Sequence, residues 1–256
     1  MITKIETKPL ATLAVAAAML GLCLTSTRAA PSVENEGTRG AQPARSMRIG
    51  VIGAGSLGGT VGRVLVRAGY EVKFSSRHPE ELSSLTHDLG SRASTGTPRE
   101  AAEFGRVLLF AVPYEALPQL GRDLKDDIRE KVVLDACNIS SRTDRALEAE
   151  VQANGAGLTS ARLLPHTRLV RAFSAVDATQ VEASFKHERE KLGVPLAGDD
   201  AEAVQMAAQL VRDAGCEPVI VGNLAACKSF DRDGPGWRAN TTAPNLRRLL
   251  GVGEGK

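Results

Sequence analysis

The sequence has few of the residues that usually carry metal or acid-base chemistry. Its four histidines show no metal-ligand spacing, and its four cysteines form no C-x-x-C pair. We therefore expect no metal site. Paired acids such as Glu80-Glu81 are typical of solvated helix ends, so no catalytic residue is assigned. Cys137, Cys216 and Cys227 are expected to be small buried hydrophobic residues.

Aromatic residues and excess charge are also scarce. Only 4% of the 256 residues are aromatic while 43% are hydrophobic, which predicts an aliphatic core for one globular α/β domain. Beyond the N-terminal segment that ends near Ala29, basic and acidic residues balance. A neutral body argues against a nucleic-acid partner or a polybasic membrane contact. We expect a small-molecule partner instead.

Apolar β-rich runs alternate with helical patterns from Met47 onward. The expected strands are Arg48–Ile52, Glu71–Ser75, Val107–Val112, Lys131–Cys137, Leu169–Val176, Gly193–Ala197 and Glu217–Val221. The expected helices are Gly55–Ala68, Glu80–Leu89, Pro98–Phe104, Tyr114–Leu124, Arg145–Ala153, Asp200–Ala214 and Ala243–Leu250. The pattern predicts one domain over residues 47–228 with late α/β additions, and an irregular C-terminal tail with a short helix over 229–256.

A glycine-rich turn joins the first expected strand and helix. It reads Gly53-Ala54-Gly55-Ser56-Leu57-Gly58. Gly53 suits the tight turn, Gly55 a close approach of backbone to pyrophosphate, and Gly58 helix packing on the strand. The helix N-terminus then offers N–H groups to the phosphates. Together with the alternating pattern, this turn predicts a Rossmann-type doubly wound, mostly parallel sheet with helices on both faces.

The end of the second strand indicates which dinucleotide binds. An NAD site usually has an acid there, but this chain has Ser76-Arg77-His78 after Ser75. A carboxylate would repel a 2′-phosphate, whereas Ser76 can donate a hydrogen bond to it and Arg77 can form a bidentate pair with it. His78 either helps or simply occupies a turn before Pro79. We predict NADP(H) as the cofactor.

Two further strands end at candidate site residues. Val107–Val112 stops at Pro113, and Lys131–Cys137 stops at Asn138. Strand ends of this kind meet at the carboxyl edge of a parallel sheet, where open α/β sheets bind their ligands.

These motifs, together with Val170-Arg171-Ala172-Phe173-Ser174, resemble the F420 (deazaflavin)-dependent NADP reductase family over about residues 47–230. The chain is also similar to the NADPH-binding domain of STEAP-type metalloreductases and to the N-terminal domain of pyrroline-5-carboxylate reductases. The resemblance implies hydride exchange between NADP(H) and a flavin or deazaflavin-like acceptor.

Carried over by position, the resemblance assigns the residues of the glycine turn to the pyrophosphate, and Ser76-Arg77 to the 2′-phosphate. It places Ala111-Val112-Pro113 along the adenosine and nicotinamide path and Asn138 near the nicotinamide. Relatives usually have Asn-Pro where this chain has Asn138-Ile139, and Ala-Phe-Asn where it has Ala172-Phe173-Ser174. These departures bear on the acceptor more than on the cofactor.

Two other functions stay open. One is a dinucleotide-binding sensor without turnover, because fold alone does not establish catalysis. The other is a pyrroline-carboxylate-type imine reductase, which shares the N-terminal signature but needs a long helical C-terminal half. Related proteins often pair, so a homodimer also stays open.

The N-terminus resembles a secretory signal. Lys4 and Lys8 precede the apolar run Leu10–Leu24, and small residues end in Thr27-Arg28-Ala29. We predict a signal peptide over residues 1–30, a flexible linker over 31–46, and a periplasmic or secreted protein without stable membrane insertion. The alternative is a start at Met47 and a cytoplasmic protein, which would explain access to the intracellular cofactor NADP.

Overall fold

The computed structural model describes residues 47–253, which belong to one compact unit. The predicted signal peptide and linker lie outside the described residues. Within them, no helix is both long and apolar enough to cross a membrane.

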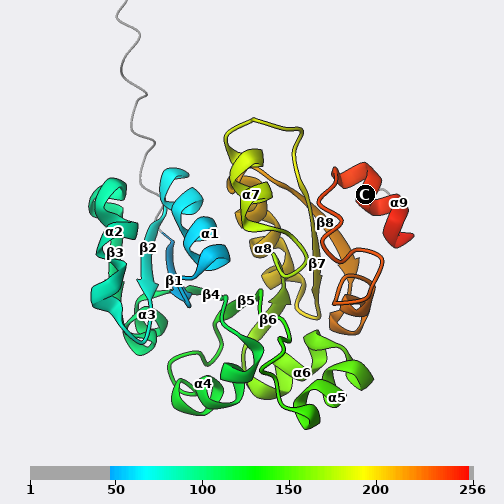
Figure 1. The fold of residues 1–256 in the computed structure, drawn as a ribbon, viewed down its shortest axis with the longest axis horizontal. Coiled ribbons are helices and arrows are strands. Elements are labelled where there is room, and N and C mark those ends of the chain that lie inside the picture. The colour runs from blue at the N-terminus through cyan, green and yellow to red at the C-terminus, as the bar shows by residue number, and fades with distance from the viewer. Residues whose placement is uncertain (1–46, 254–256) are drawn as a thin grey trace, which may run out of the picture. The chain divides into compact units, whose positions relative to one another are not determined.

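The described residues form one eight-stranded sheet (Figure 1). Its strands are β1 (Arg48–Ile52), β2 (Glu71–Ser75), β3 (Ala93–Gly96), β4 (Val107–Phe110), β5 (Val132–Asp135), β6 (Arg168–Arg171), β7 (Gly193–Gly198) and β8 (Glu217–Gly222). The order across the sheet is β3-β2-β1-β4-β5-β6-β7-β8. All neighbouring pairs are parallel except β6 and β7, so β7 and β8 run opposite to the other six strands.

Helices cover both faces of this sheet (Figure 1). The α-helices are α1 (Ser56–Arg67), α2 (Ser83–Thr86), α3 (Pro98–Phe104), α4 (Leu117–Asp123), α5 (Arg145–Asn154), α6 (Ala156–Leu163), α7 (Ala178–Phe185), α8 (Ala201–Asp213) and α9 (Ala243–Leu250). One buried cluster joins the sheet to α1, α7 and α8, and a second joins it to α3, α4, α5 and α6. The predicted single-domain, doubly wound α/β fold is therefore confirmed.

Several predicted elements differ in extent or were missed. The expected strand Leu169–Val176 ends at Arg171, because Phe173 has a left-handed backbone (φ 59°) that cannot continue a strand. The expected helix Glu80–Leu89 is broken into short helical turns, two of them 3₁₀ (Pro79–Leu82 and His87–Arg92) around α2. Three short elements, β3, α6 and α7, were not predicted from the sequence.

The C-terminal segment over residues 229–253 contributes to the core. The predicted helix Ala243–Leu250 is present as α9, and the residues before it are irregular, as expected. Phe230, Ala243 and Leu246 are nonetheless buried against the β7–β8 side of the sheet. This segment therefore contributes to the domain instead of trailing from it.

Candidate functional site

The glycine turn packs tightly between β1, α1 and the end of β4. Gly53 has φ +97°, and a Cβ on it would lie 2.6 Å from a methyl carbon of Val112 and 2.7 Å from the Ala111 carbonyl oxygen. A Cβ on Gly58 would lie 2.1 Å from the Gly53 carbonyl oxygen. These two positions exclude side chains because backbone passes too close.

Gly55 has the opposite environment. A Cβ added there would meet nothing within 4 Å, so its face is open. No side chain caps α1, and its first turn contains no acid. The first N–H groups of a helix have no partner within it, so the turn offers free amides and a positive dipole end to an anion. The open face beside free amides fits a pyrophosphate, and an acid-free first turn adds no repulsion.

The residues after β2 divide into a structural and a ligand-facing group. Ser75 is fully buried and donates a 2.7 Å hydrogen bond to the Val51 carbonyl, so it is structural. Ser76 lines a cleft and its hydroxyl oxygen accepts a 3.1 Å hydrogen bond from the His78 amide. Arg77 is exposed and lines the same cleft, and the described residues hold no ion-pair partner for it. Its guanidinium is thus available to a 2′-phosphate.

His78 does not line that cleft. Its Nδ1 lies 3.3 Å from a carboxylate oxygen of Glu80, and both side chains are exposed. The structure therefore favours a turn role for His78 over direct cofactor contact.

The cofactor cleft has a volume of about 1020 Å³ along the carboxyl edge of the sheet. Of the predicted residues, it is lined by Gly53, Ala54, Gly55, Ser76, Arg77, Ala111, Val112 and Pro113. Ser56, Leu57 and Gly58 are the first residues of α1 and are not among the lining residues. Asn138 lies outside this cleft but pairs with Pro113 in a parallel bridge that extends β4 and β5.

Sequence reasoning missed residues that also line the cofactor cleft, including Thr97, Arg99, Glu115 and Arg142. Arg99 is held by the Asp127 carboxylate and the Asp123 carbonyl, so it is already partnered. No local motif marked any of these residues.

Glu115 fastens the loop after β5 to the cleft. Its carboxylate accepts hydrogen bonds from the hydroxyls of Ser140 (3.2 Å) and Thr143 (3.3 Å) and lies 3.1 Å from Nε of Arg142. The side chain of Arg142 is 74% exposed, so its pairing adds little stability on its own. The cluster as a whole holds the loop between Asn138 and Thr143 in place.

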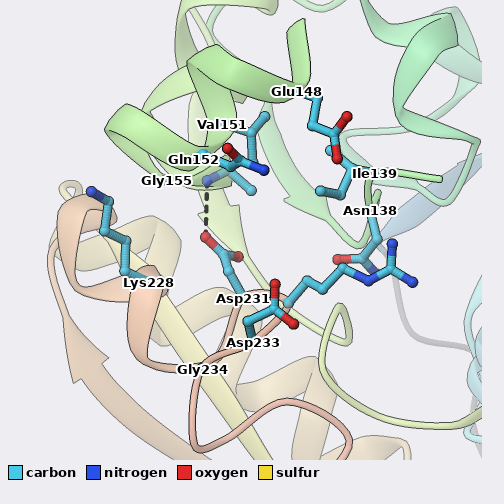
Figure 2. A pocket seen from close by; sticks show the side chains of 12 residues that line it. Asn138, Ile139, Glu148, Val151, Gln152, Gly155, Lys228, Asp231, Asp233 and Gly234 are labelled. Atoms are coloured by element: carbon cyan, nitrogen blue, oxygen red, sulfur yellow. Dashed lines mark hydrogen bonds between the residues drawn. The ribbon is translucent and has the colours of Figure 1, made fainter. Parts of the chain in front are cut away.

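A second cavity of about 560 Å³ has Asn138 and Ile139, at the start of this loop, in its lining (Figure 2). Its walls are α5, the residues after β5, and the loop near residue 231. It is lined by Asn138, Ile139, Glu148, Val151, Gln152, Gly155, Ala156, Lys228, Asp231, Arg232, Asp233 and Gly234. Ile139 lines this cavity while Arg142 lines the cofactor cleft, so one loop separates the two.

A buried ion cluster lies beneath the second cavity. Arg171, 0% exposed, donates to the carboxylates of Asp135 and Asp231, each at 2.9 Å, and to the Cys137 carbonyl at 2.7 Å. Asp231 also accepts from the Ala156 amide at 2.9 Å. The cluster joins β5, β6, the start of α6 and the C-terminal segment.

The same cluster fixes the side chain of Asn138. Its amide oxygen accepts from Arg171 at 3.2 Å, and its amide nitrogen donates to the Ser174 carbonyl at 2.8 Å. Asn138 lies where the sequence placed it, at the carboxyl edge, but its amide is engaged by the protein. The Ser174 hydroxyl is buried without a hydrogen-bond partner in the part of the chain that the structure describes.

Charge and burial set the ionisation of this cluster. Burial alone would lower the pKa of Arg171, but the carboxylates of Asp135 and Asp231 outweigh it and hold that pKa above its ordinary value. Burial, reinforced by Asp231, raises the pKa of the Cys227 thiol to about 12. Burial also raises the pKa of Cys137 well above its usual range. Within residues 47–253, no three or more His, Cys, Asp or Glu residues are arranged to hold a metal ion.

The sheet topology, the open glycine turn and the acid-free end of β2 together define a dinucleotide-binding α/β protein. Residues 48–139 match the family model described as NADP oxidoreductase, coenzyme F420-dependent. The resemblance inferred from the sequence is thereby confirmed: over residues 48–139 the chain is similar to NADP-dependent oxidoreductases.

Individual proteins show how far the likeness extends. The metalloreductase STEAP3 of Rattus norvegicus is 26% identical over 213 residues, which are 82% of this chain and 41% of that protein. The chain thus spans about two fifths of that relative.

Two solved structures share the fold. A hypothetical protein from Sinorhizobium meliloti has a TM-score of 0.66 at 24% identity, covering 77% of this chain and 96% of its own. A protein described as a putative F420-dependent NADP reductase, from Arthrobacter, has a TM-score of 0.55 at 17% identity, covering 80% and 96%.

Proposed function

We propose that the protein is an NADPH-dependent oxidoreductase that passes hydride between NADP(H) and a flavin or deazaflavin-like acceptor. The observation that carries the proposal is the cofactor cleft. It holds an open, amide-rich turn at Gly55 and an arginine, Arg77, with no ion-pair partner among residues 47–253, and it ends at Pro113 beside a second cavity.

Different residues of the cleft would bind different parts of the cofactor. The amides of Ser56 and Leu57 would hold the pyrophosphate, and Ser76 and Arg77 the 2′-phosphate. The dinucleotide would then run from β2 across β1 to β4, which brings its nicotinamide end toward Pro113. NADPH, when bound, supplies hydride from its nicotinamide, and the acceptor takes up that hydride with one proton from water. Such a transfer depends on positioning and exclusion of water more than on acid-base side chains.

A sensor that binds NADP(H) without turnover is the second candidate. It is supported by Asn138 and Ser174: the Asn138 amide is held by Arg171 and the Ser174 carbonyl, and the Ser174 hydroxyl is buried. The Asn138 amide is thus already engaged, and the Ser174 hydroxyl is unpaired among the described residues but enclosed, so neither group is presented to a nicotinamide carboxamide.

The two candidates separate in a pair of measurements on the purified protein. NADPH and NADH affinities are measured by calorimetry, and NADPH oxidation is then followed with riboflavin, FMN, FAD, a deazaflavin and a cyclic imine. We expect NADPH to bind more tightly than NADH and to be oxidised by a flavin or deazaflavin. Binding without turnover on any acceptor would support the sensor. Absence of NADPH binding would overturn both candidates, and turnover with the imine alone would support an imine reductase.

Export and pairing remain predictions with direct tests. Export rests on Lys4, Lys8 and the apolar run Leu10–Leu24. An N-terminal residue between Ala29 and Pro31 in the native protein would support it, and Met47 would contradict it. A homodimer would appear as a doubled mass in light scattering.

A further inference from the structure

We infer that the second cavity is the acceptor site and that it takes a flat heteroaromatic ring without anionic groups. This inference rests on the proposed function and adds the place and charge of the acceptor. It follows from where the two cavities meet, from the cavity's walls and from the charges around its floor.

The position of the cavity matches the end of the cofactor path. Pro113 lines the cofactor cleft, Asn138 lines the second cavity, and the two residues are paired in a β-bridge. With the 2′-phosphate at Arg77 and the pyrophosphate at Gly55, the nicotinamide end reaches this boundary. A hydride acceptor must lie within near-attack distance of the nicotinamide. The second cavity is the described space on that side of the boundary.

The walls suit a flat ring. Ile139, Val151 and Ala156 offer apolar surface, while Gln152 offers an amide for the polar edge of a ring. Figure 2 shows Gln152 on α5 and Ile139 after β5 on different sides of the cavity, with the loop that carries Asp231 and Asp233 along a third. The Gln152 side chain is exposed and its amide has no hydrogen bond to the described residues, so that amide is free to bind.

The floor of the cavity is negative. Asp135 and Asp231 share a single guanidinium, that of Arg171, which leaves a formal charge of −1 in a buried group. Half-buried Glu148 adds a second negative charge without an ion-pair partner among the described residues. Buried charges are screened less than exposed ones. An anionic group on the acceptor would therefore be repelled here.

The cations of the cavity do not cancel this field. Lys228 and Arg232 are both exposed, so water and salt screen them. Lys228 donates its ammonium to the Ala153 carbonyl at 2.6 Å, at the end of α5. The exposed carboxylate of Asp233, next to Arg232 in the same loop, offsets the positive charge of Arg232. The net negative charge around the second cavity therefore favours riboflavin-like rings over phosphorylated flavins.

Equilibrium binding tests the charge preference without turnover. Riboflavin, FMN and FAD carry the same ring, but riboflavin is neutral whereas FMN and FAD bear anionic phosphate groups. Quenching of flavin fluorescence reports binding to the full chain with and without NADP⁺. We expect riboflavin to bind at least about tenfold more tightly than FMN, and FAD to bind no better than FMN. Equal or tighter binding of FMN would overturn the charge preference.

A filling variant tests the location. Gln152→Trp places an indole in the cavity, and Asn154→Trp, on the same helix but outside the cavity, is its matched control. We expect Gln152→Trp to weaken riboflavin at least about tenfold, with NADPH affinity within about twofold of the parent chain. Unchanged riboflavin binding in Gln152→Trp would place the acceptor elsewhere. Unchanged NADPH affinity also reports that the variant is folded.

A charge-reversal variant separates the effect of the cavity's negative charge from the effect of its shape. Glu148→Lys should raise the FMN to riboflavin affinity ratio about fivefold or more, whereas Glu188→Lys, an exposed acid outside the cavity, should leave it unchanged. Equal ratios in both variants would refute the role of the floor charge. Riboflavin binding that depends on Gln152 in a protein unable to bind NADPH would refute the proposed function while keeping the cavity as a ring-binding site.

Discussion

The cofactor cleft and the second cavity are built in different ways. Around the cleft, the decisive contacts are between backbone atoms of one short segment, such as the approach of Gly58 to Gly53. Beneath the cavity, a single guanidinium joins residues far apart in the sequence: Arg171 is 36 positions from Asp135 and 60 from Asp231. Local backbone geometry thus forms the cofactor cleft, whereas a charge network between residues distant in the sequence supports the second cavity.

The largest effect is expected from breaking that network. Arg171→Met should lower the free energy of unfolding by about 3–5 kcal/mol, because it leaves the carboxylates of Asp135 and Asp231 buried without a cation. Urea denaturation of the apo protein measures the change.

Arg168→Met is the matched control for Arg171→Met. Arg168 pairs with Asp200 and Glu202 at the surface, so its loss should cost far less stability. Equal losses in both variants would mean that the buried network is no more important than a surface pair.

A change on the cofactor side should affect binding and leave folding intact. Arg77→Ala should weaken NADPH by about 1.5–3 kcal/mol, the range of a charged hydrogen bond, while NADH affinity stays nearly the same. Calorimetric titration with both nucleotides measures this difference, with exposed Arg129→Ala as a control. A parallel loss for NADPH and NADH would show that Arg77 is structural.

Two glycines of one turn should respond differently to the same methyl group. Gly58→Ala should cost about 1–3 kcal/mol of stability, because its Cβ would meet the Gly53 carbonyl oxygen. Gly55→Ala has open space and should leave stability nearly unchanged while weakening NADPH. Thermal melting and nucleotide titration of both variants separate these effects. A stable Gly58→Ala protein would contradict the packing described here.

The smallest effect at neutral pH is expected from Cys227. The folded protein raises the pKa of this thiol to about 12 from an ordinary value near 9. Its contribution to stability is therefore fully present below pH 9 and is lost as the pH rises from 9 toward 12. Cys227→Ala should flatten the decline in stability over that range, and the native thiol should resist alkylation at pH 8. Rapid alkylation of the folded protein at pH 8 would contradict this burial.

The contrast between the two sides also explains what the sequence could predict. The turn from Gly53 to Gly58 and the pair Ser76-Arg77 are each contiguous, so their chemistry is visible in the residue order. The structure places Gly53, Ala54, Gly55, Ser76 and Arg77 in the lining of the cleft. Arg171 lies within an apolar run, and nothing local indicates that Asp135 and Asp231 will face it.

The same reasoning applies to the fold. Strongly apolar strands such as Val107–Phe110 were found, with ends that differ by a residue or two. The edge strand β3, Ala93–Gly96, was missed because its residues are small and polar, and only pairing with β2 makes it a strand. The left-handed backbone at Phe173 ended a predicted strand early, and no propensity indicates such a conformation for phenylalanine.

The reversal of β7 and β8 removes any twofold symmetry between the halves of the sheet. In a doubly wound sheet of two equivalent halves, both would direct their strand ends toward the ligand. Here the ends of β7 at Gly198 and β8 at Gly222 point to the opposite edge. The chain that leaves β8 must therefore turn back toward the ligand edge before the loop that carries Asp231 can line the second cavity.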